Sequence, residues 1–285
     1  MKCIKIIEIS KKMKNCKIIF ADLDGTLLRH DKTISAEDIA ALEELGKKKI
    51  FRVLATGRSP YSLSRVFDDD FPHFDYVIFS CGVGIINWNT KEILCSHFLV
   101  SHEIESIRKV LELHTIDYMI HKPVPDNHKF HYKKINDENH DFDRRFSYYS
   151  NCGIPLTSDG AKLEKASEVI AVISGDVAKF EIIKRSLPDL RVIRTTSPID
   201  HTSLWIEIFP KNVSKGHAAE WLCAHLDISQ QDTFSIGNDY NDIELLEWTA
   251  HSYVVENAPD EMKKNYKNTA SNQSSGFSKV IREIL

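Results

Sequence analysis

The chain has 285 residues, enough for one large domain or two of ordinary size. Its 42% hydrophobic and 27% charged residues are typical of a folded globular protein and exclude a disordered one. The 37 basic and 41 acidic residues give a net charge of -4, which argues against nucleic acid as a partner, and no apolar run approaches the roughly 20 residues that span a membrane.

The N-terminal segment and the cysteines bear on where the protein works. The apolar patch from Ile4 to Ile9 is interrupted by Lys5 and Glu8, and no small-residue cleavage site follows it, so we do not expect a secretory signal. The 6 cysteines are scattered without a Cys-x-x-Cys pair, as expected of reduced, mostly buried side chains. We therefore expect a cytoplasmic protein.

Strands and helices alternate in the first part of the chain. The apolar run in 17–22 is typical of a strand buried on both faces. Ser35 then opens a helix, with Asp38 three residues later in a variant of the capping box. Strands at 50–55 and 76–80 follow, with a helical stretch between them. This order predicts an α/β fold with a doubly wound parallel sheet, whose ligand lies at the carboxyl ends of the strands.

The same alternation returns at the end of the chain. Ser214 caps a helix, and 233–236 is a short strand. A helix at 243–248 and a strand at 252–255 follow, and Pro259 fits the first turn of another helix. The end of the chain therefore belongs to the same kind of sheet as its beginning.

Residues 87–210 differ from both ends and are richer in His, Tyr and Asn. The polar run 136–145 is expected to be a solvated loop or helix face. We predict that 87–210 form a second α/β unit, a cap inserted into a core made of 1–86 and 211–285. Its predicted elements are helices at 104–111 and from Asp176, and strands at 169–174, 191–195 and 204–209.

Two acidic residues stand where the first strand ends, in segment 22–26. Asp22 can act as a nucleophile, because a carboxylate is ionised at neutral pH and forms an acyl phosphate that water cleaves. Asp24 can protonate the leaving oxygen and later take a proton from the attacking water. Thr26 adds a hydroxyl near the phosphate. The segment therefore suits phosphoryl transfer through a covalent intermediate.

Segment 22–26 has two other interpretations. An EF-hand calcium loop needs Gly at its sixth position and Glu at its twelfth, which are Leu27 and Thr33 here, so calcium is excluded. An ordinary Asp-Gly turn at Gly25 stays open for this segment taken alone.

Three later segments offer groups that bind anions or cations. Thr56 and Gly57, after the second strand, form a small phosphate cradle, although Thr-Gly is also a common turn. Lys215 follows the capping Ser214, so that the lysine and the helix dipole would face an anion, but a lone Lys is ordinarily a surface charge. Segment 235–242 follows a strand and carries acidic and amide oxygens, which suit Mg²⁺ or an Asx-rich helix cap.

Together the four segments resemble the haloacid dehalogenase superfamily of phosphohydrolases. Their order, Asp-x-Asp-Gly-Thr-Leu, Thr-Gly-Arg, Lys-Gly and Gly-x-x-x-Asn-Asp, matches that superfamily along the whole chain. The large insertion between the second and third segments looks like the Cof-type subfamily, whose cap lies there. The resemblance implies catalytic roles for Asp22 (nucleophile), Asp24 (acid/base) and Lys215, phosphate ligands at Thr26, Thr56, Gly57 and Lys215, and a Mg²⁺ site of Asp22, Asp24, Asn238 and Asp242.

One position departs from the family pattern. The family usually has Asp where this chain has Asn238, and that Asp is ordinarily a direct magnesium ligand. An amide oxygen can still bind the ion, but without a charge. A slip of one residue would instead make Asp239 the ligand, and both registers stay open. Arg58 could reach towards the cap or the phosphate.

The sequence therefore predicts a magnesium-dependent phosphatase of a small phosphomonoester, with a sugar phosphate as the family expectation. A sugar phosphomutase remains an alternative, and so does a silent sugar-phosphate sensor, against which the intact acids and Lys215 argue. Substrate and oligomeric state are not predicted. Four residues in the insertion could face the substrate, although each is more readily a surface or packing residue: His121, Lys122, His201 and Trp205.

Overall fold

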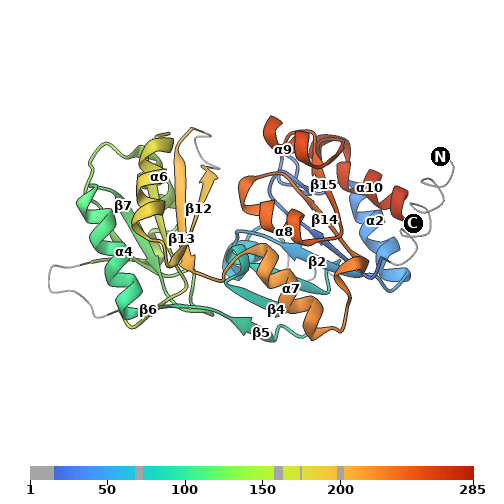
Figure 1. The fold of residues 1–285 in the computed structure, drawn as a ribbon, viewed down its shortest axis with the longest axis horizontal. Coiled ribbons are helices and arrows are strands. Elements are labelled where there is room, and N and C mark those ends of the chain that lie inside the picture. Colours follow the sequence, from blue (N-terminus) through green and yellow to red (C-terminus); the bar gives the residue numbers. More distant parts are fainter. Residues whose placement is uncertain (1–15, 68–72, 157–162, 174, 198–201) are drawn as a thin grey trace. The chain divides into compact units, whose positions relative to one another are not determined.

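The computed structural model describes residues 16–67, 73–156, 163–173, 175–197 and 202–285 (Figure 1). The N-terminal apolar patch and His201 lie outside these residues. The chain divides into two compact units. The first comprises Met1–Arg58, Leu63–Cys95 and Ser214–Leu285, and the second comprises Ser59–Ser62 and Ser96–Val213.

The first unit is built on an eight-stranded sheet in the order β16-β15-β14-β1-β2-β3-β4-β5. The strands from β16 to β3 run parallel to their neighbours, which confirms the predicted doubly wound sheet, and β4 is antiparallel to β3. The strands are β1 (Ile18–Ala21), β2 (Phe51–Ala55), β3 (Tyr76–Phe79), β4 (Gly84–Asn87), β5 (Ile93–Ser96), β14 (Thr233–Gly237), β15 (His251–Val255) and β16 (Lys267–Thr269).

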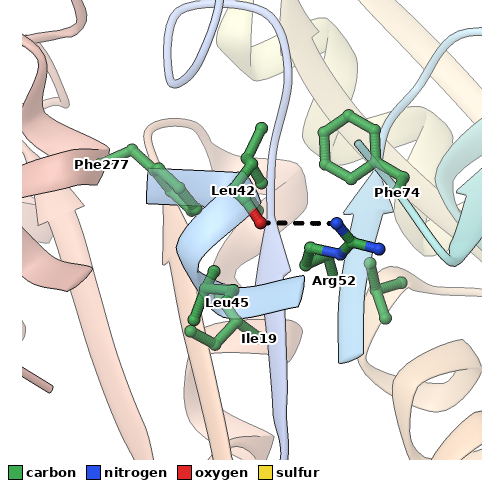
Figure 2. Close-up of a pocket in the computed structure, with 8 residues that line it drawn as sticks. Ile19, Leu42, Leu45, Arg52, Phe74 and Phe277 are labelled. Atoms are coloured by element: carbon green, nitrogen blue, oxygen red, sulfur yellow. Dashed lines mark hydrogen bonds between the residues drawn. The ribbon is translucent and has the colours of Figure 1, made fainter. Parts of the chain in front are cut away.

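Helices cover both faces of this sheet. Ile18 and Phe20 of β1 belong to an apolar cluster with the helices α7 and α8, whereas the alternate residue Ile19 faces α2 and α10. Figure 2 shows Leu42 of α2 and Phe277 of α10 on this second side, where they line a small pocket together with Ile19. The helices of this unit are α2 (Ala36–Lys47), α7 (Lys215–His225), α8 (Ile243–Trp248), α9 (Asp260–Asn265) and α10 (Gly276–Ile284), with 3-10 turns η2 (Ser80–Gly82), η4 (Gln230–Asp232), η5 (Tyr240–Asp242) and η6 (Asn272–Ser274).

The helix starts follow the predicted capping residues. The Ser35 hydroxyl accepts a hydrogen bond from Asp38 N at 3.0 Å, and that of Ser214 accepts one from His217 N at 3.1 Å. A short helix, α3 (Pro60–Ser64), crosses between the two units. None of the helices in the described part of the chain is both long and apolar enough to cross a membrane.

The long insertion of the second unit begins later in the chain than the sequence indicated. We placed its start at residue 87, but 87–95 belong to the first unit, because β4 and β5 extend the sheet of that unit. Asn87 N donates to Glu92 O at 2.8 Å, and Lys91 N donates to Asn87 O at 2.8 Å. These bonds close a tight hairpin that the short apolar runs on either side did not reveal.

The second unit has a six-stranded sheet in the order β12-β13-β11-β7-β8-β9, so β1 and β13 lie in different sheets. Side chains on one sheet face pack against α4 and α6, and α5 packs on the other face. The elements are β6 (Leu99–Val100), α4 (Ser101–Leu113), β7 (Asp117–His121), β8 (Phe130–Lys133), α5 (His140–Tyr148), η3 (Ser150–Cys152), β9 (Gly153–Pro155), β10 (Lys165–Ala166), β11 (Glu168–Ile173), α6 (Val177–Ser186), β12 (Leu190–Thr196) and β13 (Leu204–Pro210).

The polar run 136–145 is only partly solvated, contrary to the prediction. Asn139 caps α5, and its side chain accepts a hydrogen bond from Phe142 N at 3.2 Å. Asp141 and Phe142 are then buried against the second face of the sheet. Their burial was not visible in the sequence, because a three-turn helix can bury one narrow stripe within a polar run.

Candidate active site

The predicted site residues gather at one edge of the first sheet. Asp22 directly follows β1, and its N–H donates to Ile236 O of β14 at 3.0 Å. Thr56 follows β2, and its N–H donates to Ile78 O of β3 at 2.9 Å. Because these strands are parallel neighbours, their carboxyl ends meet, as expected for the ligand side of such a sheet.

Lys215 joins two acids in the interior of the first unit. Its ammonium lies 2.8 Å from Asp22 Oδ1 and 2.6 Å from Asp242 Oδ1, and its side chain is 0% exposed. Burial alone would lower the pKa of Lys215, but the two carboxylates more than offset this effect and raise the pKa above its usual value. Lys215 is therefore a fixed cation at neutral pH, rather than the solvated charge that a lone Lys ordinarily is.

The surroundings of Asp22 favour its neutral form. Burial raises its pKa to about 7, Lys215 opposes that rise, and Asp242 adds to it. A further positive charge beside Asp22 would favour its ionised form, which is the form that attacks phosphorus. The site therefore suits an additional cation.

Asp242 fixes the loop after β14. Its Oδ2 accepts hydrogen bonds from Asn238 N at 2.8 Å and from Asp239 N at 3.1 Å. Gly237 makes room for this arrangement, because a Cβ there would lie 2.6 Å from Asp242 Oδ2. With Oδ1 on Lys215, both carboxylate oxygens of Asp242 are engaged, so this residue acts on the site through Lys215 and the loop.

Asn238 faces the first acidic segment. When its amide nitrogen is turned towards that segment, it lies 2.9 Å from Asp22 Oδ2 and 3.1 Å from both Asp24 O and Thr26 Oγ1. The opposite orientation keeps only the bond from the Thr26 hydroxyl to Asn238 Oδ1, at 3.1 Å. Gly25, at φ +83°, permits the approach, since a Cβ there would lie 2.5 Å from the amide nitrogen.

Arg58 pairs with the second acid. Its Nε and Nη2 each lie 2.6 Å from one oxygen of Asp24, a bidentate ion pair. The main-chain N–H of Arg58 donates to Thr56 Oγ1 at 3.1 Å. Arg58 was expected to reach towards the cap or the phosphate, and in this structure its guanidinium lies on Asp24. This contact was not predictable from the sequence, because it joins side chains that follow two different strands.

Two further residues at the site were not singled out from the sequence. Asn241 Oδ1 lies 3.4 Å from the Lys215 ammonium, and Asn241 Nδ2 donates to Cys81 Sγ at 3.6 Å. Cys81 sits in a left-handed turn after β3, in which Gly82 has φ +106° and a Cβ on Gly82 would lie 2.3 Å from Ser214 O. Asn241 could have been found as the first residue of the Asn-Asp pair, whereas Cys81 had no such signal.

The oxygen atoms at this point of the site are of the type that binds magnesium. Asp22 Oδ2 and the main-chain oxygen of Asp24 lie within 3.1 Å of the Asn238 amide, whose own oxygen can turn inward. Hard oxygens from one or two carboxylates, completed by water and substrate oxygens, are what Mg²⁺ takes in phosphate-processing sites. The described residues hold no cluster of three or more His, Cys, Asp or Glu that would form an all-protein cage. Asp239 Oδ1 accepts a hydrogen bond from Tyr240 N at 2.8 Å.

The four candidates in the insertion have different surroundings. His121 and Trp205 are buried, Lys122 is half-buried, and His201 is outside the described residues. All three described residues belong to the second unit.

Comparison with known proteins places this geometry in a family. A family model for haloacid dehalogenase-like hydrolases matches residues 19–281. The 5-amino-6-(5-phospho-D-ribitylamino)uracil phosphatase YwtE of Bacillus subtilis is 27% identical, over 94% of this chain and 98% of its own.

Two solved structures share the fold. SMU.1108c of Streptococcus mutans has a TM-score of 0.78 at 23% identity, covering 94% of this chain and 98% of that chain. The subclass IIB sugar phosphatase BT4131 has a TM-score of 0.77 at 19% identity, covering 94% of this chain and 100% of that chain.

Proposed function

The chain belongs to the haloacid dehalogenase-like hydrolase family, and on that premise we propose that this phosphatase cleaves a small phosphomonoester with Mg²⁺ through a phospho-aspartyl intermediate on Asp22. The observation that carries the proposal is the buried ammonium of Lys215, held at 2.8 Å from Asp22 and 2.6 Å from Asp242. A fixed cation beside an acidic nucleophile is what phosphoryl transfer requires and what a structural turn does not.

In the first half-reaction, an Asp22 oxygen forms a bond to phosphorus while the bond from phosphorus to the ester oxygen breaks. Negative charge then spreads over three equatorial oxygens. The Lys215 ammonium and the hydroxyls of Thr26 and Thr56 are the groups of this chain that would balance and hold those oxygens. Bound Mg²⁺ would supply the remaining positive charge, next to Asp22, the Asp24 carbonyl and Asn238.

Asp24 is the proton carrier in this proposal. It gives a proton to the leaving oxygen and, in the second half-reaction, takes one from the water that cleaves the acyl phosphate. The bidentate pair with Arg58 holds the Asp24 carboxylate in one orientation before substrate arrives. A phosphate dianion is a competing partner for the guanidinium, so substrate binding would loosen the pair. The freed Asp24 carboxylate would take up a proton from solvent before it gives that proton to the leaving oxygen.

The substrate class is proposed from the relatives. YwtE acts on a phosphoribitylamino compound, and BT4131 is a sugar phosphatase. We infer a polyol or sugar phosphate for this chain as well. The second unit, with most of its residues in 96–213, would serve as the cap that selects the leaving group and excludes water.

Phosphate release tests the proposal. The purified enzyme, with Mg²⁺ or with EDTA, is assayed against hexose, pentose, pentitol, triose and nucleoside phosphates, beside the folded Asp22→Asn variant. Metal-dependent release that disappears in the variant supports the proposal. Movement of phosphate to another hydroxyl without free phosphate would identify a mutase, and silence across the panel together with tight binding would identify a sensor.

A further inference from the structure

We propose that the second unit carries its own binding site for a neutral polar group with an adjacent hydrogen-bond donor and acceptor, centred on His121 and Arg145. The inference rests on the proposed function, because the group would be part of the phosphate ester that the enzyme cleaves. Two buried nitrogen atoms without a hydrogen-bond partner among the described residues carry it: the acceptor Nε2 of His121 on β7 and the donor Nε of Arg145 on α5.

The site lies on the face of the six-stranded sheet opposite α4 and α6. Along β13, Ile206 and Ile208 point into the apolar core under those helices, so the alternate residues Trp205 and Glu207 point the other way. On the neighbouring strands of the same face, Glu168 of β11 pairs in register with His121 of β7. Both glutamates are at least nine-tenths buried.

His121 is a buried neutral acceptor. Its side chain is 6% exposed, and its Nδ1 lies 2.8 Å from the main-chain oxygen of Asn127. Because a carbonyl can only accept, Nδ1 carries the proton, and Nε2 is left as an acceptor. Nε2 is buried and has no hydrogen-bond partner among the described residues. Burial, with the charge of Arg145, lowers the pKa of His121 to about 3, so the ring stays neutral.

Arg145 is a half-buried cation whose guanidinium packs on Trp205 and whose Nε is buried. Its guanidinium carbon lies 4.3 Å from the centre of the Trp205 ring, and Trp205 is fixed in turn by a 2.7 Å bond from Nε1 to Asp141. Asp141 is occupied, since it also accepts from Ser197 Oγ at 3.0 Å. Within the described parts of the chain, no hydrogen bond or ion pair engages the guanidinium, and its Nε is buried without a partner. A guanidinium so placed has donors to offer to a ligand.

The charges around Arg145 indicate what the ligand is. Burial lowers the pKa of Arg145, and Tyr149, Glu168, Glu207 and Asp141 oppose that effect, so the guanidinium already has acidic neighbours. A second anion would be repelled there. A neutral group that accepts from Arg145 and donates to His121 Nε2 satisfies both residues. Vicinal hydroxyls of a polyol have this chemistry, and so does the N–H and C=O edge of a heterocyclic amide.

Two variants remove the His121 acceptor and the Arg145 donors separately. His121→Asn keeps a donor in place of Nδ1–H and lacks the Nε2 acceptor, and Arg145→Met keeps the stem over Trp205 and lacks the donors. Arg144→Met is the matched control, because Arg144 is the exposed neighbour on the same helix. Each variant is assayed with the best sugar or polyol phosphate and with p-nitrophenyl phosphate, whose leaving group has no such donor–acceptor pair. Binding of ribitol and of uridine is measured by titration calorimetry.

We expect both variants to raise KM for the best substrate by at least about tenfold. Their kcat/KM for p-nitrophenyl phosphate should change less than about twofold. Both should also lose calorimetric binding of ribitol or of uridine, whichever the wild type binds. Equal losses on both phosphates would show that the two residues only support the fold. No change on either would show that water fills the site. Either result overturns the inference. If the wild type releases no phosphate from any ester, the proposed function fails, while the calorimetric arm still decides the binding site.

Discussion

Asn238 is the position where a single substitution tests the proposed magnesium site most directly. Its amide nitrogen lies 2.9 Å from Asp22 Oδ2, so the neutral amide satisfies an oxygen that would otherwise face a cation. Asn238→Asp replaces that donor with a carboxylate of nearly the same shape. We expect the variant to bind Mg²⁺ more tightly and, without metal, to be less stable than the wild type.

The magnitude follows from the geometry. Two unit charges 4 Å apart interact by about 4 kcal/mol at an effective dielectric constant of 20, so one added charge attracts a divalent ion by about 8 kcal/mol before desolvation. Without metal, the same carboxylate stands close to Asp22 and repels it, or takes up a proton instead. Desolvation and protonation offset most of this gain, and we expect a net tightening of at least about tenfold in the magnesium dissociation constant.

Calorimetric titration with Mg²⁺ and thermal melts with and without the ion measure both effects without relying on turnover. Asn238→Ala, which removes the amide oxygen, should weaken binding. Asp239→Ala is the comparison variant, because the Asp239 carboxylate accepts a hydrogen bond from Tyr240 N at the start of the next turn. If Asp239→Ala abolishes the magnesium response and Asn238→Ala leaves it intact, the register is off by one residue and Asp239 is the ligand.

Four other substitutions test the catalytic acids, the buried ion pairs of Lys215 and the buried ring of His121. Asp22→Asn should abolish phosphate release, and Asp24→Asn should slow it by about 10²–10⁴-fold; wild-type release by a folded Asp22→Asn would exclude the covalent route. Lys215→Met leaves two buried carboxylates unpaired and should lower the free energy of unfolding in urea by about 3–5 kcal/mol, whereas a loss below about 1 kcal/mol would mean that the acids take up protons or water instead. Burial lowers the pKa of His121 to about 3 from an ordinary 6.5. Below pH 6.5 the unfolded chain therefore takes up a proton at this residue that the folded protein does not. The free energy of unfolding then falls with pH by up to about 1.4 kcal/mol per unit, whereas above pH 6.5 it loses nothing through His121. His121→Asn should flatten the decline in unfolding free energy between pH 6.5 and 4.5, and an unchanged decline would assign it to other groups.

The parts of the fold that follow from periodicity were predicted well. The buried run of β1, the Ser35 cap of α2 and the Ser214 cap of α7 each depend on neighbouring residues only, so a single sequence contains the signal. The hairpin from β4 to β5 was missed, since its strands are four residues each and part of β5 is exposed. The burial of Asp141 was missed because it depends on Trp205, 64 residues further along the chain.

In the candidate site, too, the positions of single residues were predicted, whereas the contacts between distant side chains were not. Asp22, Thr56 and Lys215 stand at strand ends or helix starts, positions that a pattern of strands and helices fixes without knowledge of side-chain contacts. The pairing of Arg58 with Asp24 joins residues 34 apart, and the contact of Asn241 with Cys81 joins residues 160 apart. Such contacts depend on how loops from different strands meet, which residue type and spacing do not encode.

The charge balance of the site links its metal to its phosphate. At their usual charges, Asp22, Asp24 and Asp242 carry three negative charges, while Lys215 and Arg58 carry two positive ones, which leaves -1. An aspartate at position 238 would make this -2, so Asn238 weakens the attraction for Mg²⁺ and leaves the loaded site at +1 instead of neutral. A phosphate dianion is then attracted more strongly by this chain than by its Asn238→Asp variant. The variant that tightens magnesium should therefore weaken product inhibition by inorganic phosphate, measured at saturating Mg²⁺. If both ligands tighten together, the effect of residue 238 is one of geometry and not of charge.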